Sequence, residues 1–155
     1  MRKHQMTLIS DFFFFLHDEQ YPKGLNFIAS YFTPRMSRLS EENSLIVFGI
    51  QGFIKDYLIE RFNDTFFNVP LETILKEYER VIKHTLSHSY CEPTKIAELH
   101  SLGYLPIEIK ALKEGTKCPI KVPCIEITST KPGFEWVVQF IESIMSCQLW
   151  YPMTI

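Results

Sequence analysis

The sequence contains no run of five or more lysines and arginines, and this absence argues against a nucleic-acid-binding surface. The formal net charge of −2 over 155 residues points the same way, because such surfaces are strongly basic. The four cysteines include no CxxC pair and form no recognisable disulfide framework, which favours a reducing cytoplasm. We therefore predict a cytoplasmic protein with no nucleic-acid partner.

Long apolar segments are missing as well. No stretch approaches the roughly 18 apolar residues that a membrane-spanning helix needs. The opening MRKHQMTLISDFFFFL imitates a secretion signal, with a basic start followed by an apolar run. Asp11 interrupts this run, however, and His17-Asp18-Glu19 stands where small residues should mark a cleavage site. We predict neither a membrane partner nor secretion.

Recognisable catalytic and metal-binding motifs are also absent. The six glycines form no phosphate loop of the Walker or dinucleotide type, and no nucleophile sits in a recognisable elbow. His84, His88 and Cys91 have a spacing that can bind zinc, but no fourth ligand is evident and a polar helix end is the simpler interpretation. The residue pattern alone predicts no catalytic residue and no metal site.

The chain is rich in aromatic rings. Aromatic residues make up 14% and hydrophobic residues 46% of the sequence, which is enough for one core and one domain over residues 1–155. Four consecutive phenylalanines, Phe12 to Phe15, lie near the N-terminus. In an extended segment alternate side chains face opposite ways, so two rings would pack inward and two would face a cleft or a partner.

Two arginines, Arg35 and Arg38, stand in TPRMSR directly after a predicted strand. A loop in this place could aim both guanidinium groups at an anion. A solvated loop is the interpretation that spacing alone favours.

The hydrophobic period predicts an α+β fold. Apolar steps of three and four residues indicate helices over residues 44–62, 71–85, 93–102 and 134–148. Alternation, or β-branched and aromatic content, predicts strands over residues 26–33 and 105–110 and from residue 120. We expect Asn63-Asp64 to end the first helix, Gly103 to cap the third in the left-handed conformation and the last helix to end at Trp150–Pro152.

Several blocks of the sequence resemble the nicotinamide phosphoribosyltransferases. The most specific are GYLPIEIKALKEG at 103–115 and WVVQFIESIMSCQLWYPMTI at 136–155, and DFFFFLHDEQYPKG, SYFTPRMSR and VFGIQGFIKDYL occur in the same order. This resemblance covers nearly the whole chain. It implies the N-terminal domain of a type II phosphoribosyltransferase, with the downstream barrel missing, and hence a truncated single domain over residues 1–155.

The resemblance also implies an activity. These enzymes join nicotinamide to 5-phosphoribosyl 1-pyrophosphate, giving nicotinamide mononucleotide and pyrophosphate in NAD salvage. They are dimers with active sites at the subunit interface. Magnesium is expected for the complete enzyme and no cofactor for this chain alone, because the family's catalytic residues lie in the missing part.

Three residues match substrate-binding positions of the family. Phe13 takes the place of the tyrosine that stacks on the pyridine ring, Asp11 keeps the acidic position at the base end, and Arg35 matches an arginine that contacts the phosphoribosyl pyrophosphate across the interface. Phe14 departs from the pattern, since the family has a lysine there.

Two functions stay open. The chain is either one part of a phosphoribosyltransferase that works beside a complementing C-terminal chain, or an inactive remnant or stand-alone module that binds a partner chain. In both cases we expect the chain alone to be inactive and to associate, as a homo-oligomer or with that partner. The expected apolar surfaces are Phe12 to Phe15 and the Leu149-Trp150-Tyr151 end.

Overall fold

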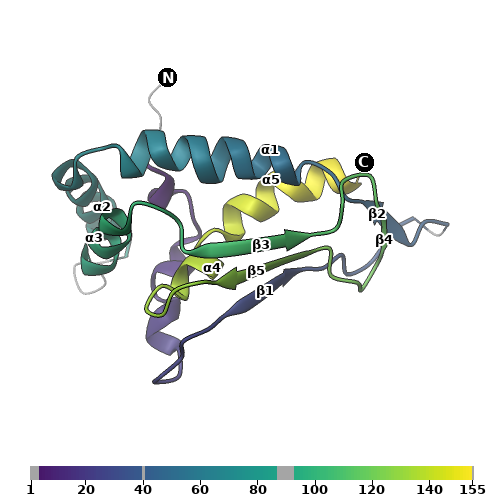
Figure 1. The fold of residues 1–155 in the computed structure, drawn as a ribbon, viewed down its shortest axis with the longest axis horizontal. Coiled ribbons are helices and arrows are strands. Elements are labelled where there is room, and N and C mark those ends of the chain that lie inside the picture. Colours follow the sequence, from purple (N-terminus) through teal and green to yellow (C-terminus); the bar gives the residue numbers. More distant parts are fainter. Residues whose placement is uncertain (1–3, 40, 87–92, 155) are drawn as a thin grey trace.

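A three-stranded antiparallel sheet lies at the centre of the computed structural model, which describes residues 4–39, 41–86 and 93–154 (Figure 1). The strands are β1 (Ala29–Phe32), β3 (Ile107–Ala111) and β5 (Ile125–Ser129), in the order β1-β5-β3. Because β5 has a neighbour on each side, it is the most buried of the three. The strand predicted over 26–33 is confirmed with shorter bounds, the strand predicted over 105–110 is found at 107–111, and the strand from residue 120 begins at Ile125.

A second, two-stranded sheet corrects the prediction of a helix from residue 44. β2 (Ser44–Ile46) pairs antiparallel with β4 (Lys117–Pro119), and Leu45 lies opposite Cys118, both side chains being buried. The helix begins only after Gly49, whose φ of 85° makes the turn that a residue with a side chain would adopt at a cost. Strand pairing with residues about 70 positions later in the chain thus decides the structure of residues 44–46, although their apolar spacing favours a helix.

The helix that follows Gly49 ends later in the chain than predicted. α1 (Ile50–Phe53) continues into two π-helical segments, η4 (Ile54–Arg61) and η5 (Asn63–Phe67), so Asn63-Asp64 does not end it. The Asn68 amide donates a hydrogen bond of 3.0 Å to the carbonyl of Asn63, five residues earlier, and this spacing is typical of a π-helix. Phe66 is fully buried beyond the expected break, and its burial outweighs the few tenths of a kcal/mol by which Asn and Asp disfavour a helix.

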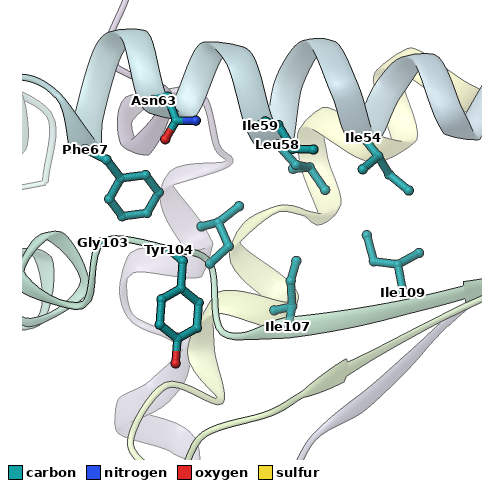
Figure 2. A pocket seen from close by; sticks show the side chains of 10 residues that line it. Ile54, Leu58, Ile59, Asn63, Phe67, Gly103, Tyr104, Ile107 and Ile109 are labelled. Carbon is teal, nitrogen blue, oxygen red and sulfur yellow. The ribbon is translucent and has the colours of Figure 1, made fainter.

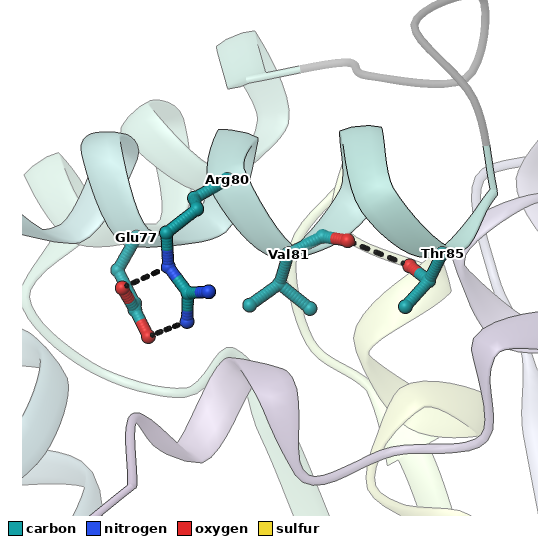
Figure 3. A network of polar contacts seen from close by, with 4 residues as sticks. All are labelled: Glu77, Arg80, Val81 and Thr85. Carbon is teal, nitrogen blue, oxygen red and sulfur yellow. Dashed lines mark hydrogen bonds and ion pairs between the residues drawn. The ribbon is translucent and has the colours of Figure 1, made fainter.

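The helices α2 (Leu71–Thr85) and α3 (Pro93–Leu102) have the predicted bounds. α2 buries Ile74, Tyr78 and Ile82 on one face. On its exposed side the Arg80 guanidinium donates two hydrogen bonds to Glu77, and near its end the Thr85 hydroxyl donates to the Val81 carbonyl (Figure 3). Gly103 has a φ of 78° and donates to the His100 carbonyl, which confirms the left-handed cap.

The last helical region consists of α4 (Trp136–Phe140) and α5 (Glu142–Thr154), with a turn at Ile141. The expected end at Trp150–Pro152 is wrong, because α5 continues through Pro152. The expected exposure of the 149–151 segment holds only in part. Leu149 is 1% exposed and packs with Pro152 beside Gly49, whereas Trp150 and Tyr151 remain exposed.

Candidate functional site

The four phenylalanines form a single 3₁₀ turn, η2 (Phe12–Phe15), and the extended segment expected from the sequence is wrong. Side chains three residues apart eclipse one another in such a turn, so the Phe12 and Phe15 rings lie together with their centroids 5.5 Å apart. The Phe15 ring also meets the edge of Phe140 at 5.1 Å and lies 5.8 Å from Tyr78. Two rings therefore pack inward, as expected, but they are the first and the last of the four.

The candidate stacking residue Phe13 projects outward from this turn. Its side chain is 53% exposed. Asp11 is the N-terminal cap of the turn, and its Oδ1 accepts a hydrogen bond of 3.1 Å from the Phe13 amide. Asp11 and Phe13 therefore lie together in this turn. The side chain of Phe14 lies outside the described part of the chain.

Polar contacts attach this turn to the last helical region. The Ser10 hydroxyl donates to the Phe140 carbonyl at 2.8 Å, and the Asp11 amide donates to the Ser143 hydroxyl at 3.0 Å. A third contact joins the Tyr21 hydroxyl to Gln139 Oε1 at 2.7 Å. Burial and, second, the nearby Glu135 carboxylate raise the pKa of Tyr21 to about 12, so this hydroxyl remains a donor at neutral pH. Phe13 is therefore presented by a fixed turn.

Removing the cap should loosen that turn. We expect Asp11→Ala to lower the free energy of unfolding by roughly 0.5–1 kcal/mol, because the Phe13 amide loses its acceptor. Asp11→Asn keeps an acceptor oxygen and is the matched control, so it should stay close to the parent in urea titrations. Equal destabilisation by both substitutions would mean that the charge, and not the cap, matters.

Arg35 lies in the loop after β1. The Lys121 amide donates to the Pro34 carbonyl at 2.6 Å, and the Cys124 amide donates to the Phe32 carbonyl at 2.9 Å. These two hydrogen bonds fix the start of the loop, directly before Arg35. Lys121 adopts a φ of 66°, which is uncommon for a residue with a side chain. The Arg35 side chain is exposed and takes part in no ion pair found among the described residues. It can therefore face an anion from outside the chain.

The three predicted residues do not form one cluster. The turn with Asp11 and Phe13 packs against α4. Since α4 follows the C-terminal end of β5, and this end pairs with the start of β1, the turn lies near the start of β1 (Figure 1). Arg35, in contrast, follows the other end of β1. The structure thus places Arg35 beyond one end of β1 and Phe13 beyond the other. One copy of the chain offers an exposed ring at one end of the sheet and an exposed cation at the other.

An apolar groove, which sequence reasoning missed, lies between the helical segment and β3 (Figure 2). Its volume is about 480 Å³. We call it the β3 groove, and the residues that line it are Ile54, Leu58, Ile59, Asn63, Phe67, Gly103, Tyr104, Leu105, Ile107 and Ile109. The lining residues that come from the helical segment recur at steps of four and five residues, as one face of a π-helix does. This spacing is the sequence feature from which the groove could have been predicted. None of Asp11, Phe13 and Arg35 lines it.

Other site types have no support in the described residues. No three His, Cys, Asp or Glu side chains among them are placed to hold a metal ion, and His88 and Cys91 of the zinc-like spacing lie outside the described residues. Within the same residues, every helix is too short or too polar to cross a membrane.

Comparisons with known proteins extend these observations. No family model matches the chain. Over 149 residues the chain is 38% identical to a nicotinamide phosphoribosyltransferase of Acinetobacter baylyi (strain ATCC 33305 / BD413 / ADP1), an alignment that covers 93% of this chain and 30% of that protein. Among solved structures it is similar to human nicotinic acid phosphoribosyltransferase, with a TM-score of 0.61, 14% identity, and coverage of 94% of this chain and 26% of the other.

These matches bear on family and fold separately. The resemblance to the nicotinamide phosphoribosyltransferases is confirmed by the sequence match, and the coverage is consistent with the N-terminal portion of such an enzyme. The human structure shows the fold alone, and it confirms the α+β fold of a type II phosphoribosyltransferase. The chain spans 30% of the length of the curated relative.

Proposed function

We propose that this chain, the counterpart of the N-terminal part of a nicotinamide phosphoribosyltransferase, supplies substrate-binding residues to an active site that further polypeptide completes. The reaction joins nicotinamide to 5-phosphoribosyl 1-pyrophosphate and releases pyrophosphate. The observation that carries this proposal is the match to the Acinetobacter baylyi enzyme along nearly the whole chain. The cysteine content, with no CxxC pair and no disulfide framework, motivates a cytoplasmic location.

The proposed roles follow from the exposed groups. Phe13 stacks on the pyridine ring, because its ring is exposed on a capped turn and a flat π-face is what such stacking needs. Asp11 stands beside it at the base end. Arg35 binds phosphate oxygens, for which the planar guanidinium offers two parallel donors.

One observation supports a requirement for further polypeptide. Phe13 and Arg35 lie beyond opposite ends of β1, so neither end of a single copy carries all three groups. We propose that this further polypeptide carries the barrel of the family, because a second copy of this chain would add only a second set of the same residues.

A second candidate function rests on Phe14. The replacement of the family's lysine by an apolar ring removes a cation from the phosphate end. This favours a module that associates with a partner phosphoribosyltransferase without contributing to chemistry.

A complementation assay separates the two functions. We expect the chain, mixed with the part of the Acinetobacter baylyi enzyme that it does not match, to form nicotinamide mononucleotide. In this mixture Phe13→Ala should raise the KM for nicotinamide up to about tenfold, since aromatic pairs contribute roughly 0.5–1.5 kcal/mol. Phe27→Ala is the matched control, because Phe27 is 55% exposed and has no proposed role.

The alternatives give different results in this assay. A complex that forms without turnover would favour the binding module. Turnover that Phe13→Ala and Phe27→Ala affect equally would exclude stacking by Phe13.

A further inference from the structure

A four-residue turn just before β5 holds a lysine in a backbone conformation that favours glycine. The Val122 amide donates to the Pro119 carbonyl at 3.3 Å and closes this turn. Lys121 is its third residue, and among the described residues no other side-chain-bearing residue has a positive φ. A positive φ at this position of a turn normally belongs to glycine or asparagine, because a β-carbon there crowds the neighbouring carbonyl oxygen. Lys121 therefore takes its place at a cost in backbone energy.

Among the described residues, the Lys121 side chain forms no ion pair that could offset this cost. The side chain is exposed. Residues in such sparsely populated conformations cluster at ligand sites, where the strain accompanies a binding role. The ammonium group of Lys121 can therefore face an anion from outside the chain.

The turn lies against both ends of the loop that carries Arg35. The Lys121 amide donates to the Pro34 carbonyl at 2.6 Å, so the Lys121 backbone lies beside the residue that precedes Arg35. The Ile120 amide donates to the Asn43 carbonyl at 2.9 Å, at the far end of the same loop. Both cationic side chains are exposed and long, and their backbones are held near each other, so both can reach one anion.

We propose that Lys121 is a second phosphate-binding residue, which acts together with Arg35 on the phosphate oxygens of 5-phosphoribosyl 1-pyrophosphate. The two side chains offer different contacts. The guanidinium group presents two parallel donors to one phosphate group, whereas the ammonium group is a compact charge with three donors that can turn toward different oxygens. For the identity of the ligand, this inference rests on the proposed function.

Titration of the chain alone with inorganic pyrophosphate tests the pairing without requiring turnover. Followed by the amide signals in ¹H–¹⁵N NMR at constant ionic strength, the parent chain should show saturable shifts in the Arg35 loop and at Lys121. Lys121→Gly should weaken this binding about three- to tenfold, because it removes one of two charges that face the anion. Lys121→Arg keeps the charge and should bind nearly as well as the parent.

The same substitution separates binding from folding. Glycine adopts the φ of Lys121 without strain, so Lys121→Gly should unfold at an equal or higher urea concentration than the parent. A loss of pyrophosphate affinity with retained stability cannot arise from misfolding. Lys131→Gln is the matched control, because Lys131 is exposed beyond the other end of β5 and its charge should not affect the binding.

The complemented enzyme gives a second measurement. In it, Lys121→Gly should raise the KM for 5-phosphoribosyl 1-pyrophosphate by a similar factor and leave the KM for nicotinamide unchanged. If the mixture shows no turnover while the chain alone binds pyrophosphate through Lys121, the proposed function fails and the role of Lys121 stands.

Three outcomes would overturn the proposal. These are a parent chain whose amide signals do not respond to pyrophosphate, a Lys121→Gly variant that binds pyrophosphate as tightly as the parent, and a Lys131→Gln variant that loses as much affinity as Lys121→Gly.

Discussion

The purified chain, incubated with nicotinamide, 5-phosphoribosyl 1-pyrophosphate and magnesium, is expected to form no nicotinamide mononucleotide above the uncatalysed background. Enzymes accelerate reactions by about a millionfold or more, largely through charges and dipoles already placed around the reacting atoms. The described part of this chain offers one exposed ring, one nearby carboxylate and one arginine as candidates. Because Phe13 and Arg35 lie beyond opposite ends of β1, these groups do not surround one substrate.

The assay needs a positive and a specific negative control. The full-length Acinetobacter baylyi enzyme should turn over under the same conditions, and the chain mixed with the unmatched part of that enzyme should regain activity. Turnover that co-purifies with the chain alone and disappears in Arg35→Ala would contradict the prediction, because it would mean that this chain already carries a complete site.

In the complemented enzyme, Arg35→Ala is expected to weaken 5-phosphoribosyl 1-pyrophosphate about ten- to hundredfold and to leave nicotinamide affinity nearly unchanged. A hydrogen-bonded arginine–phosphate contact contributes roughly 1.5–3 kcal/mol, and it involves no atom of the base. Isothermal titration of each substrate, supported by the two KM values, measures the difference. The Arg35 side chain is exposed, so the substitution should not disturb folding.

Two further variants sharpen this result. Arg38→Ala removes the same charge from the same loop, and it should have a smaller effect if the family position is the one that binds phosphate. Arg35→Lys keeps the charge but loses the planar pair of donors, so its affinity should lie between those of the parent and Arg35→Ala. An equal loss for both substrates in Arg35→Ala would indicate misfolding of the loop and not a lost contact.

Elements with a long and regular pattern were predictable from the sequence. The face of α2 formed by Ile74, Tyr78 and Ile82 follows the four-residue steps of a helix, and β3 alternates as an edge strand does. Gly103 was predictable as a cap because it follows directly on a helical pattern and glycine adopts a positive φ without strain.

Short or paired elements were not predictable in this way. β2 and β4 have three residues each, and each exists because the other lies beside it. The continuation of the helix past Asn63 likewise depends on where Phe66 can be buried, and that place is built by distant residues. Local propensity differs by less than about 1 kcal/mol per residue, so tertiary contacts of this kind decide such elements.

For the candidate site, the sequence by itself determined which residues are available: a ring at Phe13, a carboxylate two positions before it, and a guanidinium at Arg35. It also determined the family, through blocks spread over nearly the whole chain. Only the tertiary structure decided that Phe12 and Phe15 pack inward while Phe13 projects, because that choice depends on Tyr78 and Phe140 as packing partners. It also decided that Arg35 stands apart from Phe13, since the antiparallel pairing of β1 with β5 places them beyond opposite ends of one strand.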